Sequence, residues 1–389
     1  MLWLFLADKF DFVHVFQVLV TGHDLSIICF CSGYDYRVCL DFNEIYDFDG
    51  SWERLYHHLN GRGVYSLEQE LKELKLNPLH ESIVYFLEPE LIDNIKREII
   101  HPVIKGKKKE DSIAKEVEQR IGYIVGNLNN VQSFHFDYEK IIAGITNNIE
   151  AAKKLIRTLN SFQRKHPVIY REVLKFFVIS KDDELNDKWA TLFSLLLINT
   201  ILNSDNNVNG LFEELILGKP LHSALVKATQ NHDEAGNNIA LIKILTSKNR
   251  VELWNASNQS GQKARKKTTI NESELLNLLL DDDETRWYIS VNEYEGIKYF
   301  NKERFENLIN WLFTLTSLTS SSKKARVSVD EQIKELQKNY KLSKKIKKAA
   351  ADSGYKFNYL LSSFQKEKVK PKGRIKKGAI KKSVKKRKG

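Results

Sequence analysis

The C-terminal end of the chain carries the densest run of side chains that could bind a ligand. Residues 366–389 contain 13 basic residues and one acidic residue. Such a segment cannot bury enough apolar surface to order itself, and its cations can neutralise phosphates in a salt-dependent way. No aromatic residues interrupt the run, so no preference for single strands follows. We expect a disordered tail that either keeps the chain soluble or binds polyanions through Lys376, Lys377, Lys381, Lys382, Lys385, Lys386, Arg387 and Lys388.

Aromatic residues are the second group that could bind a ligand, because the faces of sugar rings pack on aromatic planes. The candidates for contact with carbohydrate are Trp52, Tyr56, Trp287, Tyr294 and Tyr299. Tyr288 belongs to the same set of aromatics. An aromatic at helical or strand spacing is usually part of the core, so a packing role is the alternative.

Three other motifs have a structural interpretation that we prefer. Asn231-His232-Asp233 lies between two expected helices, where Asn and Asp are ordinary turn and cap residues. Asp47 and Asp49 resemble the opening of a calcium loop, but the residues after Gly50 break the ligand register, so they are expected to cap a helix that starts near Ser51. Cys29 and Cys31 alternate on one strand and lack zinc-knuckle spacing. We therefore predict no metal and no cofactor.

Charge is distributed unevenly along the chain. Of 389 residues with a net charge of +11, residues 322–389 contribute 24 basic and 5 acidic side chains, a net of +19. The preceding 321 residues hold the remaining 37 basic and 45 acidic side chains, a net of −8. An acidic body gives no reason to expect a nucleic-acid-binding fold outside the tail.

The apolar composition predicts a folded protein outside membranes. Hydrophobic residues make up 42% of the chain, which excludes general disorder, and no run is long enough for a transmembrane helix. The opening MLWLFLA lacks the basic flank and the cleavage site of a signal peptide. With three cysteines, the chain has no disulfide framework. We expect a cytoplasmic protein that binds no membrane.

The expected secondary structure that positions these residues changes from strands to helices near residue 46. β-branched and aromatic runs at 10–20, 25–31 and 36–42 predict an antiparallel meander, which is part of a sheet rather than a whole one. Amphipathic helical patterns follow, including one that starts at Ser66 and is expected to stop before Pro78. Residues 188–203 predict a helix buried on most sides, and residues 328–351 a lysine-rich helix.

The expected fold is therefore mainly α: a helical body after a short N-terminal β meander, with a basic disordered C-terminal tail. We divide the chain into a partial sheet at 1–45, helical regions at 46–165 and 166–321, and the lysine-rich helix with its tail at 322–389.

Four blocks in order resemble one family. They are LDFNEIYDFDGSWERLYHHLNGRGVYSLEQEL at 40–71, LKLNPLH at 74–80, LGKPLHSAL…LIKILTS at 217–247 and VNEYEGIKYFNKERFENLINWL at 291–312. Together they resemble the region after the catalytic barrel in large bacterial alpha-amylase-family proteins, glycoside hydrolase family 13. The resemblance spans about 280 residues and stops before the basic tail. A conserved Trp of the family is missing ahead of the L-G-K block, where Phe212 to Leu215 stand instead.

The resemblance implies a role in α-glucan metabolism without the catalytic machinery. Family members use carboxylates at the strand ends of a (β/α)₈ barrel, and this chain has neither the alternating units nor the blocks that hold the catalytic carboxylates. The leading hypothesis is a non-catalytic accessory or C-terminal portion that supports a barrel on a separate chain. Any activity of its own would be that of an alpha-amylase-type glycosidase. The alternative hypothesis is a cytoplasmic nucleic-acid or ribosome-associated protein that acts through its tail.

Overall fold

The computed structural model describes the chain in segments. They are residues 2–8, 13–17, 19–21, 24–26, 39–100, 107–131, 136–163, 166–168, 170–171, 185–204, 210–247, 250–258, 272–322 and 328–366. Helices dominate these residues, which confirms the mainly α expectation. The tail residues 376–388 lie outside them. None of the helices in these segments is long and apolar enough to cross a membrane.

The N-terminal strands pair antiparallel, as expected, but in a different order. β1 (Leu2–Asp8) is central, with β2 (Val13–Gln17) on one side and β5 (Cys39–Tyr46) on the other. The short strands β3 (Leu19–Thr21) and β4 (Asp24–Ser26) form a separate pair. The meander expected from residue 10 onwards thus leaves out the central strand. The apolar run at the start of the chain supplies this central strand, because a short apolar run is also typical of a buried strand.

The helices group into two compact units. The first takes its described residues from 1–248 and 318–329, and the second from 249–317 and 330–389. The four-part division expected from the sequence stays a prediction.

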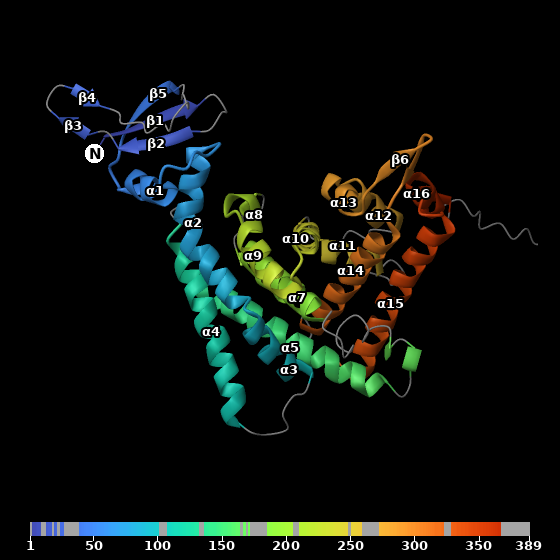
Figure 1. Ribbon diagram of the computed structural model, residues 1–389. Helices are drawn as coiled ribbons and strands as arrows, with labels where there is room; N and C mark the ends of the chain where they lie inside the picture. Colours follow the sequence, from blue (N-terminus) through green and yellow to red (C-terminus); the bar gives the residue numbers. More distant parts are fainter. Residues whose placement is uncertain are drawn as a thin grey trace, which may run out of the picture. The chain divides into compact units, whose positions relative to one another are not determined.

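The helices of the first unit are the following: α1 (Ser51–Leu59), α2 (Leu67–Phe86), α3 (Pro89–Ile100), α4 (Lys107–Asn129), α5 (Tyr138–Phe162), α7 (Leu185–Ser204), α8 (Leu211–Glu214), α9 (Gly218–Thr229) and α10 (His232–Thr246). α2 packs beside α4 and α9, and α7 contacts α5, α9 and α10 (Figure 1). α7 is buried on most sides, as predicted, from Trp189 to Leu202.

α2 corrects one expected boundary. The helix does not stop before Pro78 but continues to Phe86. Proline removes one helical hydrogen bond, yet burial of Leu76, Leu79 and Ile83 on both sides of it favours the continuous helix. Tertiary packing therefore overrides a local helix-breaking signal.

The second unit contains the following elements: α11 (Arg250–Asn258), α12 (Glu272–Leu280), α13 (Asp283–Tyr288), β6 (Asn292–Tyr294), β7 (Ile297–Tyr299), α14 (Lys302–Ser322, with its last residues counted in the first unit), α15 (Val329–Asp352) and α16 (Phe357–Lys366). β6 and β7 form an antiparallel hairpin, and α16 packs against α12 and β7. The lysine-rich helix expected at 328–351 is confirmed by α15. An edge contact between Phe313 of α14 and Tyr340 joins the two long helices.

Candidate functional site

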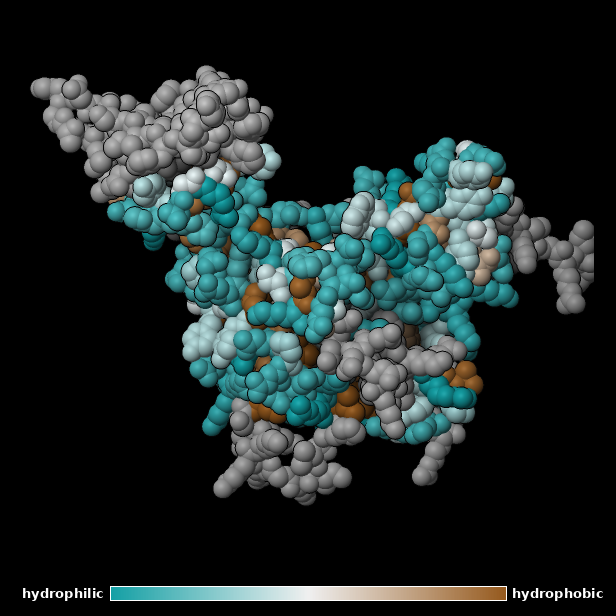
Figure 2. Space-filling model, in the orientation of Figure 1, coloured by the Kyte–Doolittle hydropathy of each residue, from teal (hydrophilic) through white to brown (hydrophobic). Residues whose placement is uncertain are grey.

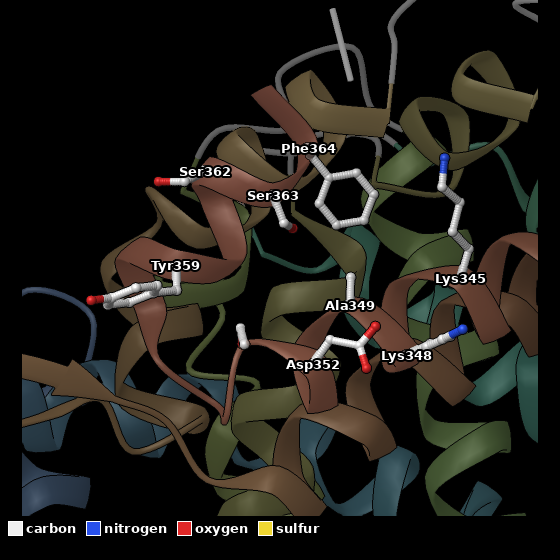
Figure 3. Close-up of a pocket in the computed structure, with 9 residues that line it drawn as sticks. Lys345, Lys348, Ala349, Asp352, Tyr359, Ser362, Ser363 and Phe364 are labelled. Atoms are coloured by element: carbon white, nitrogen blue, oxygen red, sulfur yellow. The ribbon is translucent and has the colours of Figure 1, made fainter. Parts of the chain in front are cut away.

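A candidate site in the described part of the second unit is a groove between α15 and α16. Its volume is about 440 Å³, within the range typical of ligand sites. In Figure 3 the ring of Phe364 lies between Tyr359 and Lys345. The groove is lined by Lys345, Lys348, Ala349, Asp352, Ser353, Tyr359, Ser362, Ser363 and Phe364.

A tight turn between the two helices creates the groove. Gly354 and Tyr355 have φ angles of +63° and +58°, the left-handed conformation that ends many helices. The amide of Tyr355 donates to the carbonyl of Ala350 at 3.0 Å, which closes the end of α15. The chain then starts α16, which buries Leu360 and Phe364 and leaves Tyr359 60% exposed. The turn thus places an exposed aromatic ring at the rim of the groove.

The charged side chains of the groove differ in whether they form ion pairs or hydrogen bonds with other residues. Lys345 Nζ lies 2.6 Å from Glu272 Oε2, and the same ammonium lies 5.7 Å from the centroid of Phe364. Neither the exposed Lys348 nor Asp352 has a hydrogen bond or ion pair within the described residues. These two side chains are available to a ligand.

An aromatic cluster lies next to the groove. Lys356 Nζ stands 5.9 Å from the ring centroid of Tyr299 and 5.4 Å from that of Tyr359. An isolated β-bridge pairs the backbones of Tyr299 and Lys356. The hairpin residue Tyr299 is thereby held beside Tyr359, although sixty residues separate them in the sequence.

The five predicted carbohydrate-contact residues do not form one site. Trp52 and Tyr56 belong to the first unit, where both are partly buried against a cluster of Leu55, Leu59, Val64 and Leu67. Their surroundings are those of packing residues.

The other three predicted aromatics belong to the second unit. Trp287 is 63% and Tyr294 66% exposed, so both offer ring surface to a ligand. Tyr299 is partly buried in the cluster with Lys356. Tyr359 and the polar residues of the groove were missed because they lie beyond the resembling blocks, and single aromatics in a lysine-rich helical segment give no motif.

One residue from each of two resembling blocks makes a contact between helical segments in the first unit. His80 Nε2 donates to the carbonyl of Leu215 at 2.9 Å, and Lys219 forms an ion pair with Glu73. Burial lowers the pKa of His80, which favours the neutral ring as donor. A shallow cleft of about 330 Å³ lies over this interface, between α2 and α9. These contacts join helices, which is a structural role.

The motifs given a capping interpretation all cap helices. Asn231 Oδ1 accepts from the amides of Asp233 and Glu234 at 2.9 and 3.1 Å at the start of α10. Asp49 Oδ1 accepts from the amide of Ser51 at 3.0 Å, and Asp47 Oδ2 from that of Glu53 at 2.9 Å. The hydrogen bonds to Ser51 lower the pKa of Asp49. The expected caps of α1 and α10 are therefore confirmed.

Two observations concern catalysis and metals. No Asp or Glu is buried in the segments that the structure describes. Within the same segments, no group of three or more His, Cys, Asp or Glu side chains could hold a metal ion.

Figure 2 shows that hydrophilic residues cover most of the described surface on the visible face, with small hydrophobic areas between them.

Comparison with known proteins found no relative. The chain matches no family model, no curated protein and no solved structure.

Proposed function

We propose that the chain is a non-catalytic accessory or C-terminal portion related to alpha-amylase-family glycoside hydrolases of family 13. In this proposal it works in α-glucan metabolism and supports a catalytic barrel carried elsewhere. The observation that carries the proposal is the exposed aromatic surface of the second unit. Trp287 and Tyr294 leave about two thirds of their surface to solvent, at 63% and 66%.

Exposed aromatic rings suit a sugar polymer for a physical reason. An exposed Trp or Tyr ring keeps a large apolar face in water, and a ligand with an apolar face and polar edges gains by covering it. Both faces of a pyranose ring carry C–H groups, while the hydroxyls point outward. Trp287 on α13 and Tyr294 on β6 can therefore each take one sugar ring.

The positions of the resembling blocks also support the proposal. Block 74–80 contributes His80 and block 217–247 contributes Lys219 to the interface of α2 and α9. A region that follows a catalytic barrel needs such helix contacts rather than catalytic groups. These residues of the resembling blocks thus make folding contacts, which is compatible with the proposed accessory role.

The N-terminal sheet suggests how a barrel-bearing partner would attach. Within the described strands, β2 and β5 each pair with β1 on one side only. Outer strands offer backbone donors and acceptors, and adding a strand is a common mode of association. We propose that a separate glycoside hydrolase chain pairs with this sheet.

The test of glucan binding uses gel electrophoresis of the full chain through starch, compared with a gel that lacks starch. We expect wild-type migration to be retarded and Trp287→Ala/Tyr294→Ala migration to be restored. Tyr65→Ala is the matched control, because Tyr65 is 77% exposed but belongs to the first unit. Equal migration of the wild type in both gels would refute the proposal of glucan binding.

A second candidate function is nonspecific nucleic-acid binding through the basic tail. The observation that favours it is the composition of residues 366–389, with 13 basic residues and one acidic residue. Deleting residues 366–389 should abolish RNA and DNA binding at physiological salt. Unchanged binding by the truncated chain would exclude this candidate.

A further inference from the structure

We infer that the groove between α15 and α16 binds a neutral oligosaccharide. The inference rests on the proposed function for the choice of α-glucan as the first probe, but its chemistry comes from the groove itself. It differs from the proposed surface of Trp287 and Tyr294, because none of the residues that line the groove belongs to that surface.

The charge balance of the groove favours a neutral ligand over a polyanion. The positive charge of Lys345 is matched by Glu272 at 2.6 Å. The remaining charged groups of the lining are Lys348 and Asp352, one positive and one negative. The charges that line the groove therefore balance once Glu272 is included, and Lys356, 5.4 Å from the centroid of the Tyr359 ring, is a cation beside the lining.

The hydrogen-bonding groups of the groove are mixed, as the hydroxyls of a sugar require. The hydroxyl of Ser362 donates to the carbonyl of Asn358 at 2.8 Å, and that of Ser363 to the carbonyl of Leu360 at 2.7 Å. Their oxygen lone pairs remain as acceptors, beside the carboxylate of Asp352. Lys348 supplies donors. A sugar hydroxyl both donates and accepts, whereas a phosphate only accepts and would face the Asp352 carboxylate.

Tyr359 supplies the stacking surface. The residue is 60% exposed at the rim of the groove even with Lys356 over its ring at 5.4 Å. Phe364 and Ala349 give the groove an apolar floor between its polar groups. An apolar lining with an aromatic rim and a few polar groups is a common composition of a small-ligand site.

The test measures the affinity of the full chain for maltoheptaose by isothermal titration calorimetry, with cellohexaose as the second probe. We expect binding that hardly changes between low and high salt, because the ligand is neutral. Tyr359→Ala should weaken binding about tenfold, whereas Tyr359→Phe should stay close to the wild type. Asp352→Ala should also weaken it, and Tyr65→Ala should not. Tighter binding of cellohexaose than of maltoheptaose would support an oligosaccharide site, but one for β-linked rather than α-linked glucose chains.

The outcomes separate this inference from the proposed function. If Trp287→Ala/Tyr294→Ala abolishes starch binding while Tyr359→Ala has no effect on maltoheptaose, the groove inference falls and the proposed function stands. If neither oligosaccharide binds, the groove inference is overturned. If a single-stranded oligonucleotide binds instead, with an affinity that falls steeply with salt and is lost in Tyr359→Ala, the groove is a nucleic-acid site and the inference is wrong.

Discussion

Asp282 connects two stabilising interactions at the start of α13, so its removal gives a sharp test of the packing of the second unit. Its Oδ2 accepts from the amide of Thr285 at 3.1 Å and from the hydroxyl of Thr285 at 2.8 Å. Its Oδ1 lies 3.4 Å from Nη2 of Arg250. The side chain of Arg250 is only 2% exposed. Burial lowers the pKa of Arg250, and the charge of Asp282 opposes that shift.

The magnitude follows from these two interactions. Loss of an N-cap costs about 1 kcal/mol. Leaving a buried charge without its partner costs about 3–5 kcal/mol, and Arg250 keeps a hydrogen bond to the carbonyl of Leu278, which favours the lower end. We expect Asp282→Ala to lower the free energy of unfolding by about 4 kcal/mol. Asp282→Asn keeps a capping oxygen and should cost about 1 kcal/mol less.

The assay is urea denaturation of the full chain, followed by far-ultraviolet circular dichroism and tryptophan fluorescence. Asp283→Ala is the matched control, since the side chain of Asp283 is 96% exposed and its contact with Arg286 is a surface ion pair worth about 0–1 kcal/mol. The double variant Arg250→Met/Asp282→Ala should lose less than Asp282→Ala, because it removes the unpaired charge. If Asp282→Ala and Asp283→Ala unfold at the same urea concentration, the reasoning is refuted.

Three further predictions concern the first unit. His80→Ala leaves the carbonyl of Leu215 without its buried donor and should cost about 2 kcal/mol, measured by thermal denaturation. Because burial lowers the pKa of His80, the unfolded chain binds more protons below pH ~6.5, so wild-type stability should fall on acidification from pH ~7.5 to ~5.5. The fall should be smaller in His80→Gln, and an equal fall would contradict a neutral buried His80. Asn231→Ala removes the cap of α10 and should lower the free energy of unfolding by about 1 kcal/mol, measured by thermal denaturation. Unchanged stability of this variant would argue against a capping role.

The sequence predicted the helices whose signals are local. Ser66 begins α2 as its spacing indicated, with its hydroxyl accepting from the amide of Gln69 at 3.2 Å. Asn231 and the pair Asp47 and Asp49 cap helices because short polar side chains reach free amides wherever a helix starts. Such contacts lie within a few residues of each other. They can therefore be read without knowledge of the tertiary fold.

The features that depend on distant contacts were not predictable in this way. The continuation of α2 through Pro78 depends on neighbours that bury both of its halves. The strand order places β1 between β2 and β5, a pairing that spans more than thirty residues. The cluster of Tyr299, Lys356 and Tyr359 likewise joins a hairpin to α16. No spacing rule relates residues so far apart.

The net charge of the C-terminal region does not predict the charges that its groove presents. Residues 322–389 carry +19 in the sequence, which favours a polyanion as ligand. Yet Lys345 is paired with Glu272 and Lys347 donates to Asn310, so part of that charge holds α15 onto its own unit. The lining of the groove offers a ligand the ammonium of Lys348, the carboxylate of Asp352, serine oxygens and the ring of Tyr359, with Lys356 next to that ring. A segment can therefore be strongly basic while the charges that line a groove in it balance. Binding measurements at low and high salt would distinguish the two proposals, because polyanion binding by the tail would depend on counterion release.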